Sequence, residues 1–189
     1  MINKVVDKVK EKKIWLTSDL HFCHNKEFLY SPRGFDNIYD MNETIVKNWN
    51  SVVSVNDDVY ILGDLMLVNN EEGIKLLKNL KGNIHIILGN HDTGTRVELY
   101  NNCYNVVEIC YATIIKYNGY HFYLSHYPTI TGNGDKDLKH TLINLYGHTH
   151  QKTNFFNDVF FMYHVGVDSH NCFPVLIDDI IQELIKKCE

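Results

Sequence analysis

Short apolar runs alternate with polar turns along the first half of the chain. Residues 14–17, 59–62 and 84–88 are almost continuously apolar, and each run ends in a polar turn. Such runs are typical of strands that are buried on both faces of a sheet. Between them, residues 41–53 carry apolar side chains at helical spacing, and an asparagine precedes a second helical segment, 71–80. This alternation of strands and helices predicts βαβ units.

The second half of the chain has a hairpin pattern. Two β-rich runs, Tyr111–Tyr117 and Tyr120–Ser125, are separated by Asn118-Gly119, a pair that favours a type I′ turn. The whole pattern predicts one α/β domain over residues 1–189, with a mixed sheet or two packed sheets. The remaining predicted elements are strands at Leu142–Tyr146 and Val159–Val165, a loop at Gly132–Asp135, and a helix at Asp179–Lys187 with Asp178 as its cap.

Composition and charge narrow the class of protein. The 189 residues are 44% hydrophobic, as in an ordinary globular protein. The net charge is −5 and the sequence has no stripe of basic residues, so we expect no dedicated nucleic-acid surface. The five cysteines have no CxxC spacing, which predicts reduced thiols rather than a disulfide framework. The charged N-terminal stretch lacks the apolar region of a signal peptide, and no apolar run is long enough to cross a membrane. We therefore expect a cytoplasmic protein.

Polar turns with chemically useful side chains follow five of the predicted strands. The carboxyl ends of strands in an α/β sheet border the crevice where ligands bind, so turns that are far apart in sequence can meet there. The five turns are Asp19-x-His21, Gly63-Asp64, Gly89-Asn90-His91-Asp92, Ser125-His126 and Gly147-His148-Thr149-His150.

The residue types in these turns indicate metal binding. In an extended segment, residues i and i+2 point the same way, so Asp19 with His21, and His148 with His150, can ligate from one side. Together the turns offer carboxylates, imidazoles and an amide oxygen but no thiolate, a set that suits Mn, Fe, Zn or Ni, with Mn favoured. Seven candidate ligands are too many for one tetrahedral ion. They suit two adjacent divalent ions that share a carboxylate.

The ordered set of turns resembles the calcineurin-like metallophosphoesterase superfamily, and the resemblance extends from Ile14 to about Val165. Three further segments resemble a small single-domain bacterial and phage branch of it: Arg33-Gly34-Phe35, Met41-Asn42-Glu43 and Asn48-Trp49-Asn50. The resemblance implies a four-layer α/β/β/α sandwich, with two mixed sheets flanked by helices. It also implies hydrolysis of a phosphomonoester or phosphodiester through in-line attack by a metal-bridging hydroxide.

The same resemblance implies a role for each residue of the turns. Asp64 would bridge the two ions, and the Asn90 amide would also neutralise charge on the phosphoryl oxygens. His91 would act as general acid, and Asp92 would hold its imidazole in place. The ligands implied for the first ion are Asp19, His21 and His150, and those for the second are Asn90, His126 and His148.

Other residues and other functions are also compatible with the sequence. His24, Asn25 and Arg33 are candidates for substrate binding, because they follow the first metal turn and Arg33 has a planar fork that suits phosphate. Three histidines inside predicted strands are expected to be structural: His85, His121 and His164. The substrate is expected to be a small phosphorylated compound. The alternatives are an enzyme that acts on nucleotides or nucleic-acid ends, a non-catalytic scaffold with this fold, and a metal-storage protein.

Overall fold

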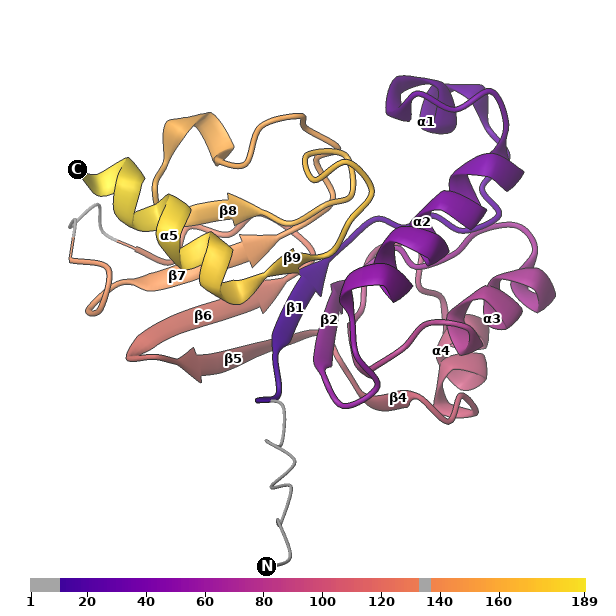
Figure 1. Ribbon diagram of the computed structural model, residues 1–189, viewed down its shortest axis with the longest axis horizontal. Coiled ribbons are helices and arrows are strands. Elements are labelled where there is room, and N and C mark those ends of the chain that lie inside the picture. Colours follow the sequence, from indigo (N-terminus) through magenta and orange to yellow (C-terminus); the bar gives the residue numbers. More distant parts are fainter. Residues whose placement is uncertain (1–10, 133–136) are drawn as a thin grey trace, which may run out of the picture.

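The computed structural model describes residues 11–132 and 137–189, and they form two β-sheets with flanking helices. The charged N-terminal residues 1–10 and most of the predicted Gly132–Asp135 loop lie outside the described residues. Figure 1 shows helices α2, α3 and α4 gathered beside β1 and β2, and helix α5 beside β7 and β9. The predicted α/β class, with two mixed sheets flanked by helices, is confirmed.

The first sheet has the strand order β4-β3-β2-β1-β9. Strands β1 to β4 run parallel to one another, and β9 pairs with β1 in the antiparallel direction. The first three strands were predicted to within one residue, whereas β4 and the two-residue β9 were not predicted. The strands are β1 Ile14–Thr17, β2 Asp58–Leu62, β3 Asn83–Ile87, β4 Val106–Cys110 and β9 Val175–Leu176.

Helices α2, α3 and α4 bury their apolar residues against one face of this sheet. Helix α2 begins after Asn37, whose side chain accepts a hydrogen bond from the Asp40 amide, and its Trp49 is fully buried in this first core. The short helices α1 and η1 connect β1 to α2. No described helix is long and apolar enough to cross a membrane. The elements are α1 Glu27–Tyr30, η1 Ser31–Arg33, α2 Ile38–Val52, α3 Asn70–Lys78 and α4 Gly94–Asn101.

The second sheet has the strand order β5-β6-β7-β8. β5 and β6 form the predicted hairpin, and both Asn118 (φ 49°) and Gly119 (φ 83°) adopt the left-handed backbone of a type I′ turn. β6, β7 and β8 are parallel. The elements are β5 Ala112–Tyr117, β6 Tyr120–Ser125, β7 Leu142–Tyr146, η2 Phe156–Asp158, β8 Met162–His164 and α5 Ile177–Cys188.

A second core joins the two sheets and α5. Leu16 and Leu62 of the first sheet, Leu124 and Leu145 of the second, and Ile180 of α5 are all fully buried in it. Beyond the strands, a parallel bridge between Ser18 and Gly166 links the chain after β1 to the chain after β8. The carboxyl ends of the parallel strands of both sheets therefore meet at one place.

Candidate metal centre

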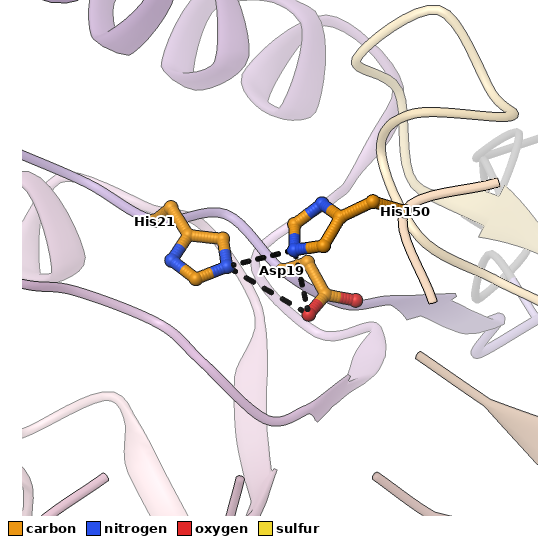
Figure 2. Close-up of side chains that lie close together, drawn as sticks. All are labelled: Asp19, His21 and His150. Carbon is orange, nitrogen blue, oxygen red and sulfur yellow. Dashed lines mark hydrogen bonds and ion pairs between the residues drawn. The ribbon is translucent and has the colours of Figure 1, made fainter. Parts of the chain in front are cut away.

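Two groups of potential ligands lie at this junction. The ligand atoms of Asp19, His21 and His150 lie within 4.8 Å of one another, and so do those of a second group. Figure 2 shows the first group, in which His21 Nε2 and His150 Nε2 are 3.2 Å apart and each lies 3.9 Å from Asp19 Oδ1. The second group consists of Asp64, His126 and His148.

The turns after the strands are held together by their main chains. The amides of Asp19 and His21 donate to the carbonyl oxygens of Gly63 and Asp64, each at 3.0 Å. On the second sheet, the Gly147 amide donates to the His126 carbonyl at 3.0 Å. The turn after β1 is thus hydrogen-bonded to the turn after β2, and the turn after β6 to the turn after β7. These turns carry the candidate ligands.

Asp64 belongs to the second group but also lies close to the first. Its Oδ2 is 3.8 Å from His21 Nε2 of the first group and 3.6 Å from His126 Nε2 of the second. The same oxygen is 3.9 Å from His91 Nε2. One carboxylate oxygen is therefore within reach of ligand atoms on both sides.

The left-handed backbone of the turns differs from the extended segments expected from sequence. Asp19, His21, His148 and His150 all have φ between 48° and 68°. The i, i+2 argument for ligation from one side is therefore not the reason for the pairing. Asp19 and His21 fall in one group, but His148 and His150 fall in different groups.

The Asp19 carboxylate tests whether a cation fits the first group. Its Oδ2 accepts hydrogen bonds from the Ser18 hydroxyl at 2.5 Å and the His148 amide at 2.8 Å. Its Oδ1 is buried, has no hydrogen-bond donor among the described residues, and faces the ring nitrogens of His21 and His150. A buried carboxylate oxygen that faces imidazole lone pairs suits a cation.

Two imidazoles are oriented by hydrogen bonds on the side away from the centre. His126 Nδ1 lies 2.8 Å from the Leu62 carbonyl oxygen, and His150 Nδ1 lies 2.9 Å from Asp168 Oδ2. Both partners are acceptors, so Nδ1 carries the proton in each ring and Nε2 keeps its lone pair. In His126 that lone pair faces Asn90 Oδ1 at 2.9 Å. Metal-binding histidines usually have this outer partner.

Burial favours the neutral form of two of the candidate ligand rings, His21 and His148. Burial, followed by the facing His150 ring and Arg33, lowers the pKa of His21 to about 2. Burial and the neighbouring His126 ring also lower the pKa of His148. Ligation requires neutral imidazole, so these two rings are in the binding form at neutral pH. In His150, burial opposes protonation, but the hydrogen bond to Asp168 and the nearby negative charges together outweigh it and raise the pKa of this ring.

Glycines precede the ligands because a side chain would collide with the site. A Cβ at Gly63, where φ is +90°, would lie 2.3 Å from His126 Nδ1. A Cβ at Gly147 would lie 2.6 Å from Asp19 Oδ2. Both distances are far shorter than a contact between unbonded atoms. The Gly-Asp and Gly-His pairs seen in the sequence thus reflect tight packing around the ligands.

His91 lies at the open side of the centre. Its side chain is 41% exposed, and its ring centroid is 5.7 Å from that of His21. Its amide donates to Asp64 Oδ1 at 2.9 Å, and its carbonyl accepts a short hydrogen bond from Arg96. The backbone of His91 is therefore fixed, while the ring is accessible from solvent.

Asp92 has partners other than the one expected from sequence. Its Oδ2 accepts from the amides of Asp64 and Gly89, both at 2.9 Å, and its Oδ1 accepts from the Tyr100 hydroxyl at 2.8 Å. The side chain is buried, and none of its hydrogen bonds among the described residues is with the His91 ring. Burial raises the pKa of Asp92, and these hydrogen bonds oppose the rise. The carboxylate fixes the backbone around Asp64 instead of holding the imidazole.

A family model matches almost the whole chain. The model describes a calcineurin-like phosphoesterase and matches residues 12–185. The chain belongs to the calcineurin-like phosphoesterase family.

Relatives of this phosphoesterase support the assignment. It is 38% identical over 184 residues to the uncharacterized protein MJ1445 of Methanocaldococcus jannaschii, and the match covers 93% of each chain. It is 37% identical over 81 residues to the gene 66 protein of Mycobacterium phage L5, covering 41% of this chain and 39% of that one. A crystal structure of the Aquifex aeolicus protein AQ665 has the same fold, with a TM-score of 0.71 and 22% identity over 92% of this chain and 100% of that one.

Arg33 reaches the centre of the phosphoesterase but does not face its open side. Its side chain is 1% exposed, and its Nε and one terminal nitrogen donate to the two oxygens of Asp168, both at 2.9 Å. The guanidinium group of Arg33 therefore forms its hydrogen bonds within the protein. The sequence had predicted that it would contact phosphate. Asp168 was not found by sequence analysis, because it follows β8 outside any of the ligand turns.

His24 and Asn25 lie beside the first group. The His24 ring centroid is 5.5 Å from that of His21 and 6.4 Å from that of His91, and its Nδ1 is buried without a partner among the described residues. Asn25 lines a neighbouring cavity of about 300 Å³ between α2 and α3. His24 thus borders the ligands, whereas Asn25 lines the neighbouring cavity.

Proposed function

We propose that this phosphoesterase hydrolyses a small phosphomonoester or phosphodiester with the help of two divalent metal ions, of which Mn²⁺ is the favoured one. The observation that carries the proposal is the position of Asp64. Its Oδ2 lies within 4 Å of ring nitrogens from both ligand groups, 3.8 Å on one side and 3.6 Å on the other. A carboxylate between two sets of imidazoles suits a pair of adjacent cations.

The residues that would hold the ions come from both sheets. Asp64 would contact both ions, which is the role the sequence resemblance implies. When bound, the ions would supply a nucleophilic water at neutral pH and positive charge for the phosphoryl oxygens. Asp19, His21 and His150 would hold the first ion, and Asn90, His126 and His148 the second.

His91 would donate a proton from its imidazole to the leaving oxygen of the substrate. The ring is partly exposed and lies next to Asp64, so a substrate bound at the centre can reach it. Its main chain is fixed at both its amide and its carbonyl, which limits how far the ring can move. A positioned general acid of this kind speeds the departure of a poor leaving group.

Asn90 would act through both ends of its amide. Its Oδ1 faces His126 Nε2 at 2.9 Å, within the second ligand group. The amino end of the same side chain is then directed away from that ring, on an exposed residue. It can donate a hydrogen bond to a phosphoryl oxygen, where negative charge grows during the reaction.

The proposal can be tested with metal-free protein and a panel of substrates. Protein stripped with a chelator would be reconstituted with Mn²⁺, Zn²⁺ or Fe²⁺. It would then be assayed on nitrophenyl phosphate, bis-nitrophenyl phosphate, nucleoside monophosphates and cyclic nucleotides. We expect hydrolysis only after a metal is restored. Activity that persists in fully metal-free protein would overturn the proposal.

A matched pair of histidine variants controls this test. His126→Gln removes a proposed ligand, and His85→Gln removes a histidine in β3 whose ring bonds Glu108 at 2.8 Å. We expect the first variant to lose metal and activity and the second to keep both. Equal losses in the two variants would mean that histidine replacement only harms the fold.

A further inference from the structure

Arg33 and Asp168 form a buried, two-pronged ion pair next to the first ligand group. They are 135 residues apart, and their side chains are 1% and 5% exposed. Two parallel N–H···O bonds of 2.9 Å give this pair a defined geometry, not only an attraction.

The pair contacts a ring and a main-chain segment of the first ligand group. Asp168 Oδ2 accepts the proton of His150 Nδ1 at 2.9 Å. Arg33 donates to the carbonyl oxygens of Asp19 at 2.9 Å and Leu20 at 3.4 Å. One ion pair therefore holds both the ring of one ligand and the main chain of another.

Both of these ligands have costly backbone conformations. Asp19 has a φ of 56° and His150 a φ of 48°, and residues with side chains adopt such values only where their surroundings enforce them. Buried ion pairs themselves add little net stability, because desolvation offsets their attraction. Their contribution here is to geometry.

We propose that Arg33 and Asp168 are positioning residues for the first metal ion, an inference that rests on the proposed two-metal function. Asp168 sets the orientation and tautomer of His150, so that Nε2 faces Asp19 and His21. Arg33 fixes Asp168 through both of its oxygens and holds the turn that carries Asp19. Among residues 11–132 and 137–189, no equivalent side-chain pair contacts the second group, where His126 is held by the Leu62 carbonyl.

Asp168→Asn is the most informative substitution. The amide has nearly the same shape, but its NH₂ can donate to His150 Nδ1. That bond would leave the ring proton on Nε2, the atom that faces the metal position. Arg33→Lys retains a positive charge but loses the two-pronged contact.

The experiment is a Mn²⁺ titration of the metal-free, full-length protein by calorimetry, with bound Mn²⁺ counted after desalting. The proposed function itself requires two Mn²⁺ sites in the unsubstituted protein, so their absence would overturn that proposal separately. We expect Asp168→Asn to weaken one of the two sites by about 10–100-fold and to leave the other unchanged. Arg33→Lys should weaken the same site to a smaller extent.

Asp57→Asn is a matched control. Asp57 is also a buried carboxylate, but it accepts from Trp15 Nε1 and the Ser54 amide at the opposite end of the first sheet. We expect this control to lower thermal stability without changing either Mn²⁺ affinity. If Asp168→Asn and Arg33→Lys keep both sites intact, or weaken both sites equally, the positioning role is wrong.

Discussion

The two ligand groups of this phosphoesterase are supported in different ways. In the first group, His150 is oriented by the Asp168 carboxylate, which is itself held by Arg33. In the second group, His126 is oriented by a main-chain carbonyl, that of Leu62, and packs against Gly63. Substitution of a single side chain should therefore alter the geometry of the first group. The geometry of the second group depends on the path of the backbone. Metal binding by each group should therefore be weakened by different substitutions.

The largest expected effect belongs to Asp64, the residue that both groups share. Asp64→Asn removes the negative charge that would neutralise both ions, so we expect metal loss from both groups and no measurable activity. His150→Ala should lose metal from the first group only. Metal content per chain and activity would be measured on the same preparations. Equal metal loss in the two variants would contradict the bridging role.

His91→Ala separates chemistry from metal binding. We expect both metals to remain and the rate with a poor leaving group to fall by about 10²–10⁴-fold. The loss should be smaller with nitrophenolate, which departs without a proton. Steady-state rates on an alkyl and a nitrophenyl phosphate, together with metal content, check this prediction. A lost metal would make His91 a ligand, and an equal loss for both substrates would contradict general-acid catalysis.

Gly63→Ala tests the dependence of the second group on the backbone. The new methyl would lie 2.3 Å from His126 Nδ1, so we expect weaker binding of the second ion and a stability loss of about 1–3 kcal/mol. Gly119→Ala is the control, because Gly119 also has positive φ but nothing within 4 Å of an added Cβ. Denaturant unfolding and Mn²⁺ titration of both variants distinguish collision from backbone strain. If Gly63→Ala weakens binding of the first ion instead of the second, the proposed dependence of the second group on the backbone is wrong.

Acid is expected to destabilise the fold through His164, whose ring packs against Gly166. Burial lowers the pKa of His164 to about 3 from its ordinary 6.5. Between these values the unfolded chain binds a proton that the folded chain does not, so stability falls as the pH drops. His164→Gln should flatten this slope by at most about 1.4 kcal/mol per pH unit. Identical slopes in metal-free wild-type and variant protein between pH 6.5 and 4 would contradict the prediction.

Local patterns in the sequence were sufficient for most of the fold. The Ile14–Thr17 strand and the hairpin around Asn118-Gly119 were predicted closely, because periodicity and turn chemistry specify them over a few residues. Helix α2 begins three residues before its predicted start, since the apolar pattern from Met41 does not include the cap at Asn37. Helix α4 has only a weak apolar stripe, and β9 has two residues, so neither gives a signal above that of a loop.

The residues of the candidate site were easier to predict than the contacts between them. The five turns are short motifs that can be read along the chain, and the structure brings their side chains together. The contacts of Arg33 and Asp92 were not predictable in this way. Arg33 was expected to face phosphate, but its partner Asp168 is 135 residues away, and no local pattern connects the two. Asp92 is buried in a turn whose shape depends on tertiary packing.

The bridge between Ser18 and Gly166 has a consequence for folding. The proposed ligands come from both sides of this bridge: Asp19, His21, Asp64 and Asn90 follow strands of the first sheet, and three histidines follow strands of the second. A cation bound by both sets favours the docked arrangement of the sheets over any form in which they separate. Well above the dissociation constant, each tenfold rise in free cation should add about 1.4 kcal/mol to the free energy of unfolding. The concentration of available metal would then govern the lifetime of the chain against proteolysis.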